Sequence, residues 1–208
     1  MAFADRGYYV ADPDFVRVPA RQMLSPDYLK QRADAITATK AAAAEIKPGS
    51  FSQNMAFGRA VELPSTSHLV IVDAAGNVVS MTTSIENAFG STLMANGYLL
   101  NNELTDFSFE PEQNGQAVAN RVEGGKRPRS SMAPTIVLKN GAPYLAVGSP
   151  GGSRIIGYVA KTLVAHLDWG MDIQQAIDLP NMLNRGSTYE LEENTPAAAK
   201  AGALERMG

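Results

Sequence analysis

The sequence predicts an α+β fold in which strands form hairpins and helices lie beside them. β-Branched and apolar runs flank turn residues at 67–85 and again at 134–148, which predicts two hairpins. Apolar side chains recur at helical spacing over 155–167, which predicts a helix. The chain has 208 residues, 45% hydrophobic and 19% charged, and this is enough for one globular domain with its own core.

The first 65 residues are expected to contain one helix between irregular segments. Residues 1–24 carry prolines and aromatic side chains without a clear period, which predicts an extended arm or loop. Ser-Pro-Asp at 25–27 then supplies an N-cap, a proline at the first helical position and a first-turn acid. A helix is therefore expected from about Asp27 to Ala44, followed by a loop over 51–65.

The pattern changes at Thr66. Residues 67–73 and 78–85 read as two strands around an Ala-Ala-Gly-Asn turn, so the first strand of this hairpin begins at the threonine. The second hairpin joins 134–139 to 144–148 through Asn-Gly, which is the strongest hairpin signal that a short sequence offers.

The segments outside the hairpins are expected to be a loop and two helices. Residues 110–126 are polar and contain glycine, which predicts a mobile surface loop. The apolar period over 155–167 predicts a helix that packs on a sheet. Residues 204–208 have the character of a further amphipathic helix, in the middle of which the sequence stops.

Charge and composition exclude several classes of function. The formal net charge of −3 gives no electrostatic reason to bind nucleic acid or anionic lipid, so small molecules or other proteins are the expected partners. There is no cysteine, hence no disulfide framework and no thiolate metal site. No apolar run reaches the roughly 18 residues of a membrane span, and the first residues lack the order of a signal peptide.

A glycine-rich segment lies between an expected strand and an expected helix, at 148–154. Backbone amides in such a segment can bind a phosphate or form an oxyanion hole for acyl transfer. The chain has no Gly-x-x-x-x-Gly-Lys-Ser/Thr and no Gly-x-Gly-x-x-Gly, so the phosphate hypothesis has little support. The glycines could also serve only to turn a tight corner.

Three other groups of polar residues leave alternatives open. Residues 124–131 combine three cations with two serines, which would suit a carboxylate or phosphate, although such runs are more often solvated loops. Residues 101–106 could receive an ammonium group or merely end a strand. His68 and His166 would be required for a metal site or a Ser-His-Asp triad, but neither has a suitable arrangement around it, so structural roles are favoured.

Taken together and in order, these segments resemble the γ-glutamyltransferase family of N-terminal-nucleophile hydrolases. The resemblance covers almost the whole chain, and no single motif decides it. The matching pieces are Asp12-Pro13-Asp14-Phe15-Val16, Thr66-Ser67-His68 running into Val72-Asp73, Gly76-Asn77, Phe89-Gly90, Leu100-Asn101-Asn102, Asp106-Phe107-Ser108, Lys126-Arg127-Pro128 with Ser130-Ser131-Met132, Pro134-Thr135-Ile136, and Gly148 to Arg154.

The resemblance implies a four-layer α/β/β/α sandwich, incomplete in this chain, and a precursor that cuts its own Ser65-Thr66 bond. Residues 1–65 would be the C-terminal part of a large subunit, and 66–208 most of a small catalytic subunit, together one structural domain. Freed Thr66 would attack γ-glutamyl amides such as glutathione, with its own α-amine as general base. Water, an amino acid or a peptide would then accept the acyl group.

Roles for further residues are also implied by the resemblance. The amides of Gly151 and Gly152 would stabilise the oxyanion, and the Ser84 hydroxyl would contact the nucleophile, although threonine is usual at that position. The substrate carboxylate would bind Ser130 and Ser131, and its ammonium Glu103 and Asp106, of which Asp106 is preferred. No metal and no cofactor are expected.

Departures from the family pattern bear on specificity and extent. Glu86 stands where asparagine is common and could strengthen ammonium binding or change the preferred acyl group, whereas Thr105 in place of an acid is expected to matter little. Only 65 residues precede Thr66, so we expect a fragment of a longer precursor, inactive alone and partnered by the rest of the large subunit. The family is periplasmic or secreted, and any signal peptide would lie upstream. The alternatives are a cephalosporin or glutaryl acylase, or a non-catalytic member that keeps the fold.

Overall fold

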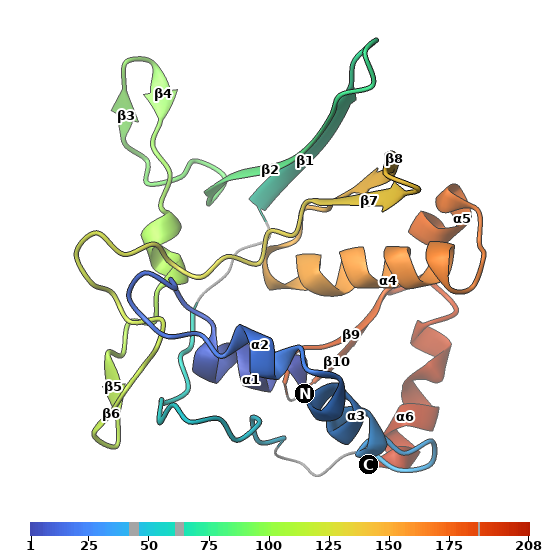
Figure 1. Ribbon diagram of the computed structural model, residues 1–208, viewed down its shortest axis with the longest axis horizontal. Helices are drawn as coiled ribbons and strands as arrows, with labels where there is room; N and C mark the ends of the chain where they lie inside the picture. The colour runs from blue at the N-terminus through green and yellow to red at the C-terminus, as the bar shows by residue number, and fades with distance from the viewer. Residues whose placement is uncertain (42–45, 61–64, 187) are drawn as a thin grey trace. The chain divides into compact units, whose positions relative to one another are not determined.

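A computed structural model describes residues 1–41, 46–60, 65–186 and 188–208. These residues form an α+β protein whose strands pair as antiparallel two-stranded sheets (Figure 1). The chain divides into two compact units: unit 1 comprises 1–61, 104–129 and 182–208, and unit 2 comprises 62–103 and 130–181. No helix in the described part of the chain is both long and apolar enough to cross a membrane. The expected division at Thr66 into two subunit regions stays a prediction.

The regular elements of unit 1 are mostly helices, with two small hairpins. Its helices are α1 (Ala2–Tyr9), α2 (Ala20–Met23), α3 (Pro26–Asp34), the 3-10 helix η3 (Ala198–Lys200) and α6 (Ala201–Met207). Its strands are β5 (Glu112–Gln113), β6 (Gln116–Ala117), β9 (Met182–Asn184) and β10 (Tyr189–Leu191). Helix α6 agrees with the amphipathic helix expected at the end of the sequence.

The expectation of an extended arm over residues 1–24 was wrong, because α1 and α2 lie within it. Helix α1 buries Asp5, Gly7 and Tyr9, so its position is set by partners far along the sequence rather than by a regular apolar period. Glycine is required at position 7, because a Cβ there would overlap the Phe57 ring. Tertiary contacts of this kind leave no local signal in the sequence.

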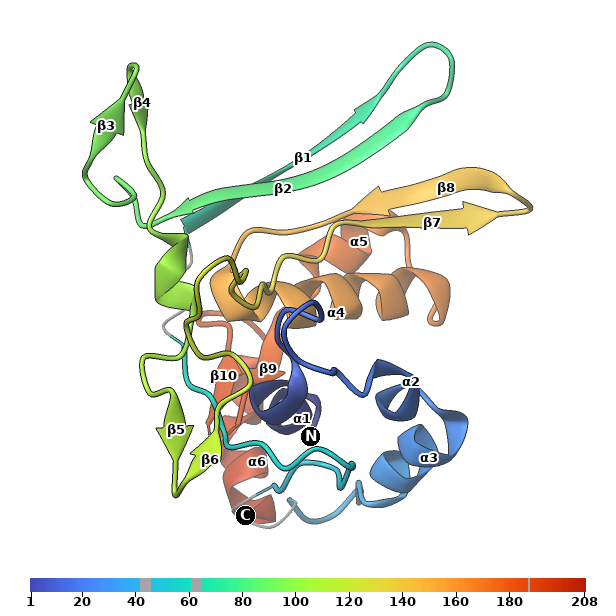
Figure 2. The same ribbon diagram turned by 60° about the vertical axis from the view of Figure 1, so that its left-hand side comes forward.

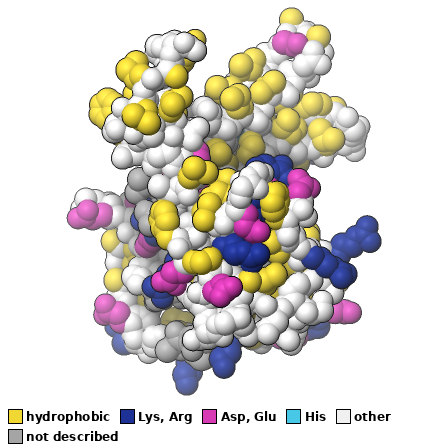
Figure 3. All heavy atoms as spheres, turned by 90° about the vertical axis from the view of Figure 1, so that its left-hand side faces the viewer, with side chains coloured by type: hydrophobic (Ala, Val, Ile, Leu, Met, Phe, Trp, Pro, Cys, Tyr) yellow, Lys and Arg dark blue, Asp and Glu magenta, His cyan; other side chains and the backbone are white. Residues whose placement is uncertain are grey.

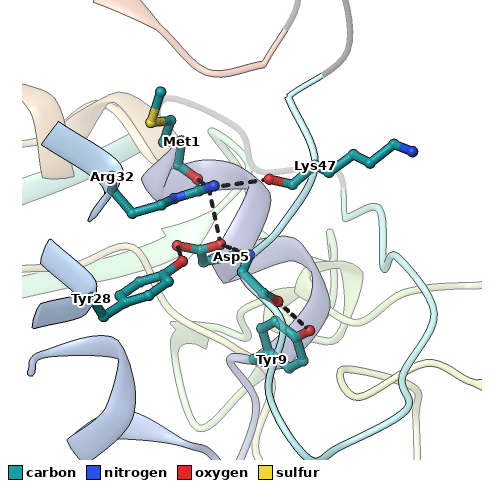
Figure 4. Close-up of polar contacts among 7 residues, drawn as sticks. Met1, Asp5, Tyr9, Tyr28, Arg32 and Lys47 are labelled. Carbon is teal, nitrogen blue, oxygen red and sulfur yellow. Dashed lines mark hydrogen bonds and ion pairs between the residues drawn. The ribbon is translucent and has the colours of Figure 1, made fainter. Parts of the chain in front are cut away.

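Asp5 is the centre of a buried polar cluster in unit 1 (Figure 4). Its carboxylate accepts hydrogen bonds from the Tyr28 hydroxyl at 2.6 Å, from Arg32 Nη2 at 3.2 Å and from the Gly49 amide at 2.7 Å. The Tyr9 hydroxyl donates to the Gly49 carbonyl at 2.7 Å. Burial and the Asp5 carboxylate raise the pKa of Tyr28 to about 12, so this phenol stays protonated as the donor.

Helix α3 begins as expected but ends early. Pro26 is its first residue, and the Ser25 hydroxyl accepts a hydrogen bond from the Tyr28 amide at 3.4 Å. The predicted extension to Ala44 was wrong: the helix ends at Asp34, and residues 42–45 lie outside the described part. Beyond its end, the Thr37 hydroxyl bonds both the amide and the carbonyl of Lys40, a local alternative to helical bonding.

The segment 110–126 is also different from its prediction as a mobile surface loop. It forms the β5–β6 hairpin and then buries Val118, Ala119 and Asn120. The Asn120 side chain bonds the Asp106 carbonyl at 2.7 Å and the Arg129 amide at 2.9 Å. Because these backbone groups are satisfied by a side chain, a segment without hydrophobic period can still be buried.

Unit 2 contains the two predicted hairpins. Strands β1 (Ser65–Val72) and β2 (Val78–Glu86) pair antiparallel, with a bulge between Ser65 and Thr66. Strands β7 (Thr135–Lys139) and β8 (Ala142–Val147) pair through the Asn140-Gly141 turn, in which both residues have positive φ. The loop expected over 51–65 has no helix or strand before Ser65 in its described residues, which confirms that prediction apart from the strand's first residue.

The remaining elements of unit 2 surround these hairpins. They are β3 (Met94–Ala95), β4 (Tyr98–Leu99), the 3-10 helix η2 (Gly152–Arg154), α4 (Ile155–Leu167) and α5 (Ile173–Asp178). A further 3-10 helix, η1 (Glu103–Asp106), begins at the last residue of this part of unit 2. Helix α4 has the expected bounds and runs alongside the β7–β8 hairpin in both ribbon views (Figure 2).

Large apolar side chains remain exposed on unit 2. Along β1, the exposed fractions rise from 39% at Leu69 to 57% at Ile71 and 63% at Val72. Val79 and Met81 on β2 are also about half exposed. Hydrophobic side chains gather in the upper part of the space-filling view, where the unit 2 hairpins lie (Figure 3). Both faces of the second half of β1, from Leu69 to Val72, are therefore apolar and open to solvent.

Candidate active site

The expected nucleophile and its neighbour are cross-strand partners at one end of the β1–β2 hairpin. Thr66 pairs with Ser84, and Ser65 pairs with Glu86 on the other side of the bulge. A bulge inserts a local kink that changes the direction of a side chain at a strand end. The sequence correctly predicted that Ser84 lies on the second strand of this hairpin.

The Ser84 hydroxyl contacts the peptide bond that the precursor is expected to cut. Its Oγ donates a hydrogen bond to the Ser65 carbonyl oxygen at 2.9 Å and accepts one from the Glu86 amide at 2.8 Å. The Glu86 amide therefore holds the Ser84 oxygen beside the Ser65 carbonyl. A donor at this carbonyl would stabilise negative charge that develops on its oxygen during attack on the carbonyl carbon.

Two carboxylates lie close to Ser84 in unit 2. One carboxylate oxygen of Glu86 is within 4.8 Å of one of Glu103, and the Glu86 side chain is only 4% exposed. Burial, together with the charge of Glu86, raises the pKa of Glu103, while a hydrogen bond with the Ser84 hydroxyl opposes this shift. A hydroxyl has one proton, so Ser84 donates either to the Ser65 carbonyl or to the Glu103 carboxylate at one time.

Asn102 holds these two acids near each other through its side chain and its backbone, and the sequence did not assign this role to it. Its side-chain oxygen accepts a hydrogen bond from the Asn87 backbone amide at 2.9 Å, and its backbone amide donates to the Ile85 carbonyl at 3.3 Å. These bonds tie the start of η1 to the end of β2. The only available signal was that polar residues follow directly after a strand-like apolar run.

The residues expected to bind the substrate's charged groups are divided between the two units. Ser130, Ser131 and Glu103 lie in unit 2, whereas Asp106 lies in unit 1 at the other end of η1. Ser131 is buried and Ser130 is exposed, with the Ser130 hydroxyl accepting a hydrogen bond from the Met132 amide at 3.1 Å. Asp106 is buried, so its carboxylate has lost most of its water.

The glycine-rich segment forms a sharp corner before α4. Gly151 has φ 137° and Gly152 has φ 57°, values that residues with a side chain rarely adopt. A Cβ at Gly151 would also lie 3.0 Å from Cε2 of Tyr158. The glycines therefore do turn a tight corner, and the role of their amides in an oxyanion hole stays a prediction.

The cations at 126–129 are occupied by contacts within unit 1, which favours the structural interpretation of that run. Lys126 Nζ donates to the Ala119 carbonyl at 2.7 Å and to Glu123 at 2.8 Å. Arg129 donates to backbone carbonyls of Arg6 and Gly58. Arg127 forms a bidentate pair with Asp12, with side-chain distances of 2.7 and 2.9 Å, and this holds the pKa of the Asp12 carboxyl well below its usual range.

Both histidines have packing and hydrogen-bonding partners in unit 2. His166 bonds the Tyr144 hydroxyl at 3.0 Å and the Met171 carbonyl at 2.8 Å. His68 bonds the Thr82 hydroxyl at 2.9 Å. Neither histidine is bonded to an acid in these contacts, so the structural roles favoured by the sequence agree with the geometry.

A cavity in unit 1 is lined by other residues than these. A cavity of about 1110 Å³ opens in unit 1, and its lining includes Lys47, Arg59, Arg185, Glu110 and Glu190. No residue predicted for catalysis or substrate binding lines it. We therefore base the candidate site on the β1–β2 strand end and not on this cavity.

Comparisons with known proteins match the chain over most or all of its length. The sequence pattern of the family described as Gamma-glutamyltranspeptidase matches residues 1–208. Glutathione hydrolase proenzyme of Bacillus subtilis (strain 168) is 40% identical over 209 residues, covering 94% of this chain and 34% of the relative. Acylase ACY 1 proenzyme of Pseudomonas sp. (strain SE83) is 33% identical, covering 99% of this chain and 35% of the relative.

A solved structure also matches. The gamma-glutamyltranspeptidase from Pseudomonas nitroreducens, complexed with L-DON, is 35% identical with a TM-score of 0.61, covering 68% of this chain and 79% of that chain. The expected fold class, α+β of the N-terminal-nucleophile hydrolase type, is confirmed, and the chain contains part of that fold. The chain spans about a third of the length of the curated relatives described above.

Proposed function

The chain belongs to the gamma-glutamyltranspeptidase family, and from that premise we propose that it is part of a self-cleaving precursor of a γ-glutamyl-transferring or γ-glutamyl-hydrolysing enzyme. Thr66 is the nucleophile of two reactions, the cleavage of the precursor and the later attack on the γ-glutamyl substrate. In the cleavage, the Thr66 hydroxyl attacks the carbonyl carbon of Ser65, and an ester between the two residues replaces the Ser65-Thr66 amide bond. Water then hydrolyses that ester. The products are a chain ending at Ser65 and a chain beginning at Thr66.

The hydrogen bond from Ser84 to the Ser65 carbonyl is the observation that carries this proposal. Attack on the carbonyl carbon moves negative charge onto the oxygen to which Ser84 donates at 2.9 Å. The Glu86 amide holds the Ser84 oxygen in place, so the hydroxyl stabilises the developing charge whenever its proton points to the Ser65 carbonyl and not to Glu103. Oriented donors of this kind typically lower a barrier by about 3 kcal/mol.

Cleavage would convert Thr66 into an N-terminal residue with its own base. The freed α-amine takes the proton from the hydroxyl as it attacks the γ-glutamyl carbonyl, and then gives a proton to the leaving amine. The result is a γ-glutamyl-Thr66 ester, which water, an amino acid or a peptide resolves. The amides of Gly151 and Gly152 stabilise the oxyanion in these steps.

The polar residues around the strand end would bind the rest of the substrate. Ser130 and Ser131 receive the α-carboxylate, while Glu103 and Asp106 receive the α-ammonium. Burial and Glu86 disfavour the charged form of Glu103 and so raise its pKa, and a bound ammonium ion would offset that cost. The remainder of the large subunit completes the pocket, and the complete protein is secreted or periplasmic.

Glu86 supports a second candidate function, that of an acylase with another acyl group as its substrate. An acylase is among the relatives at 33% identity, and a buried acid next to Ser84 would change which acyl group fits. We expect the full-length protein to turn over γ-glutamyl-p-nitroanilide faster than glutaryl-p-nitroanilide. The reverse preference would assign the protein to the acylases while leaving Thr66 as nucleophile.

Substitution of Thr66 in the full-length precursor tests the nucleophile. Thr66→Ala lacks the hydroxyl and should show no γ-glutamyl-p-nitroanilide turnover above the uncatalysed rate. Thr66→Ser is the matched control because it keeps a hydroxyl, and it should retain measurable turnover. Activity in Thr66→Ala equal to that of the wild type would exclude the proposed chemistry.

A further inference from the structure

Gly148 lies directly against the ring of His68 in unit 2. A Cβ at position 148 would lie 2.6 Å from His68 Nε2 and closer still to Cε1 and Nδ1. Real Cβ atoms do not approach other atoms this closely. Unlike Gly151 and Gly152, Gly148 does not have the positive φ that favours glycine. Glycine is required here because the imidazole occupies the place of a side chain.

The His68 ring is held from one side only. Its Nδ1 lies 2.9 Å from the Thr82 hydroxyl, and Thr82 is its cross-strand partner on β2. Its Nε2 is buried and has no hydrogen-bond partner among the described residues. The contact between the ring and Gly148 is therefore a van der Waals packing contact, because no hydrogen bond joins them.

A second contact joins the same two hairpins. The Ser80 hydroxyl on β2 donates to the carbonyl of Val147, the residue before Gly148, at 3.3 Å. The end of β8 is thus fixed to the β1–β2 hairpin at two successive residues. A ring at one position and a hydrogen bond at the next define how closely the two hairpins approach.

These contacts lie between the two parts of the proposed catalytic machinery. His68 is two residues after Thr66 on β1, so both side chains are on the same face of the strand. Gly148 is three residues before the corner at Gly151 and Gly152. The distance from His68 to Gly148 therefore determines the distance between strand β1 and the expected oxyanion hole at Gly151 and Gly152.

We propose that His68 is a positioning residue whose ring acts as a spacer between strand β1 and the glycine corner. This inference rests on the proposed function, since it assigns a role within the same site. The ring acts through its volume and not through proton transfer. A shift of the oxyanion donors by about 1 Å would cost on the order of 100-fold in rate.

Two substitutions of His68 separate the volume of the ring from its chemistry. His68→Phe keeps a flat ring and removes both nitrogens. His68→Asn keeps an amide that can bond the Thr82 hydroxyl and removes the ring. In the full-length protein we expect His68→Phe to keep kcat within about 10-fold and leave the pH profile unchanged, and His68→Asn to lose about 100-fold in kcat with KM little changed.

A size exchange with Gly148 provides an independent readout. Gly148→Ala should lose at least about 100-fold in kcat, because the methyl group and the ring cannot occupy the same space. Adding His68→Ala to that variant removes the overlap but also removes the spacer, so the double variant should lose about as much kcat as His68→Asn and not the product of the two losses. Intact mass and thermal unfolding of each variant identify any that fail to fold or to cleave.

The outcomes are distinguishable from one another. If His68→Phe loses as much kcat as His68→Asn, or loses one limb of the pH profile, the imidazole takes part chemically and the spacer is refuted. If neither His68 variant changes kcat in an active wild-type protein, the contact does not position the site and only this inference fails. A wild-type precursor that neither cleaves at Thr66 nor turns over γ-glutamyl amides refutes the proposed function instead.

Discussion

Units 1 and 2 differ in which charged side chains they bury and which apolar side chains they expose. Unit 1 buries charged groups, including Asp5, Asp12, Lys126 and Arg129, and gives each of them partners. Unit 2 exposes apolar side chains on both faces of the second half of β1, from Leu69 to Val72. Unit 1 thus depends on polar contacts between distant parts of the sequence, whereas unit 2 carries the proposed nucleophile on a hairpin whose apolar surface is open in this chain.

The largest stability effect is expected in unit 1, at Asp5. Asp5→Ala removes the acceptor of three hydrogen bonds and leaves Arg32 without its buried partner, so it should destabilise the full-length protein by about 3–5 kcal/mol. Asp34→Ala is the matched control, because the Lys30–Asp34 pair is exposed and worth at most about 0.5 kcal/mol. Urea unfolding measures both, and equal losses would contradict a special role for burial.

The next effect is on a rate and belongs to unit 2. Ser84→Ala should raise the barrier to self-cleavage by about 3 kcal/mol while changing stability little, because Ser84 donates to the Ser65 carbonyl. Ser84→Thr keeps the hydroxyl and should cleave at close to the wild-type rate. Gel electrophoresis over time follows the cleavage, and rapid processing by Ser84→Ala would remove Ser84 from the mechanism.

The two units should also respond to pH with opposite signs. The pKa of Asp12 is lowered by Arg127, so its contribution to stability is present above about pH 3.8 and is lost as the pH falls through the lower folded value. The pKa of Glu103 is raised in the folded protein. Its contribution to stability is therefore present at pH values below the ordinary pKa of glutamate, and it is lost as the pH rises through the raised pKa.

Thermal unfolding of Asp12→Asn and Glu103→Gln tests these signs. Asp12→Asn should reduce the melting temperature at pH 7 and have little effect in strong acid. Glu103→Gln should raise the melting temperature at pH 7, by less than about 1 kcal/mol in stability because solvent still screens this group. Effects of the reverse sign would contradict the electrostatic assignment.

The smallest effect is expected at the exposed face of β1. Ile71→Ser should cost less than about 0.5 kcal/mol in the 208-residue chain, because Ile71 is already 57% exposed. In the full-length protein the same change should cost about 2 kcal/mol or more if the remainder of the precursor covers this face. Equal costs in the two proteins would show that the face stays open.

The sequence predicted what local chemistry determines. Asn140-Gly141 specified the β7–β8 turn, and the apolar period specified α4, because each signal acts within a few residues. The Asn-Gly pair at 96–97 carries the same signal and lies in the β3–β4 turn, a hairpin that was not predicted. Helix α1 and the burial of 118–120 could not be predicted, since both depend on polar partners far along the sequence.

The candidate site was also only partly predictable from the sequence. Its residues were chosen by a resemblance spread over the chain, and the pairing of Thr66 with Ser84 followed from the hairpin register. The hydrogen bond to the Ser65 carbonyl and the contact of His68 with Gly148 needed atomic positions. Neither contact has a signature in residue types or spacing.

The central claim is that the precursor cuts itself between Ser65 and Thr66. Intact-mass analysis of the purified full-length protein tests it most directly, with Thr66→Ala measured beside the wild type. We expect two wild-type chains, one ending at Ser65 and one beginning at Thr66, and a single uncut Thr66→Ala chain. A wild-type protein that remains one chain, or a Thr66→Ala protein cut at the same bond, would contradict the account.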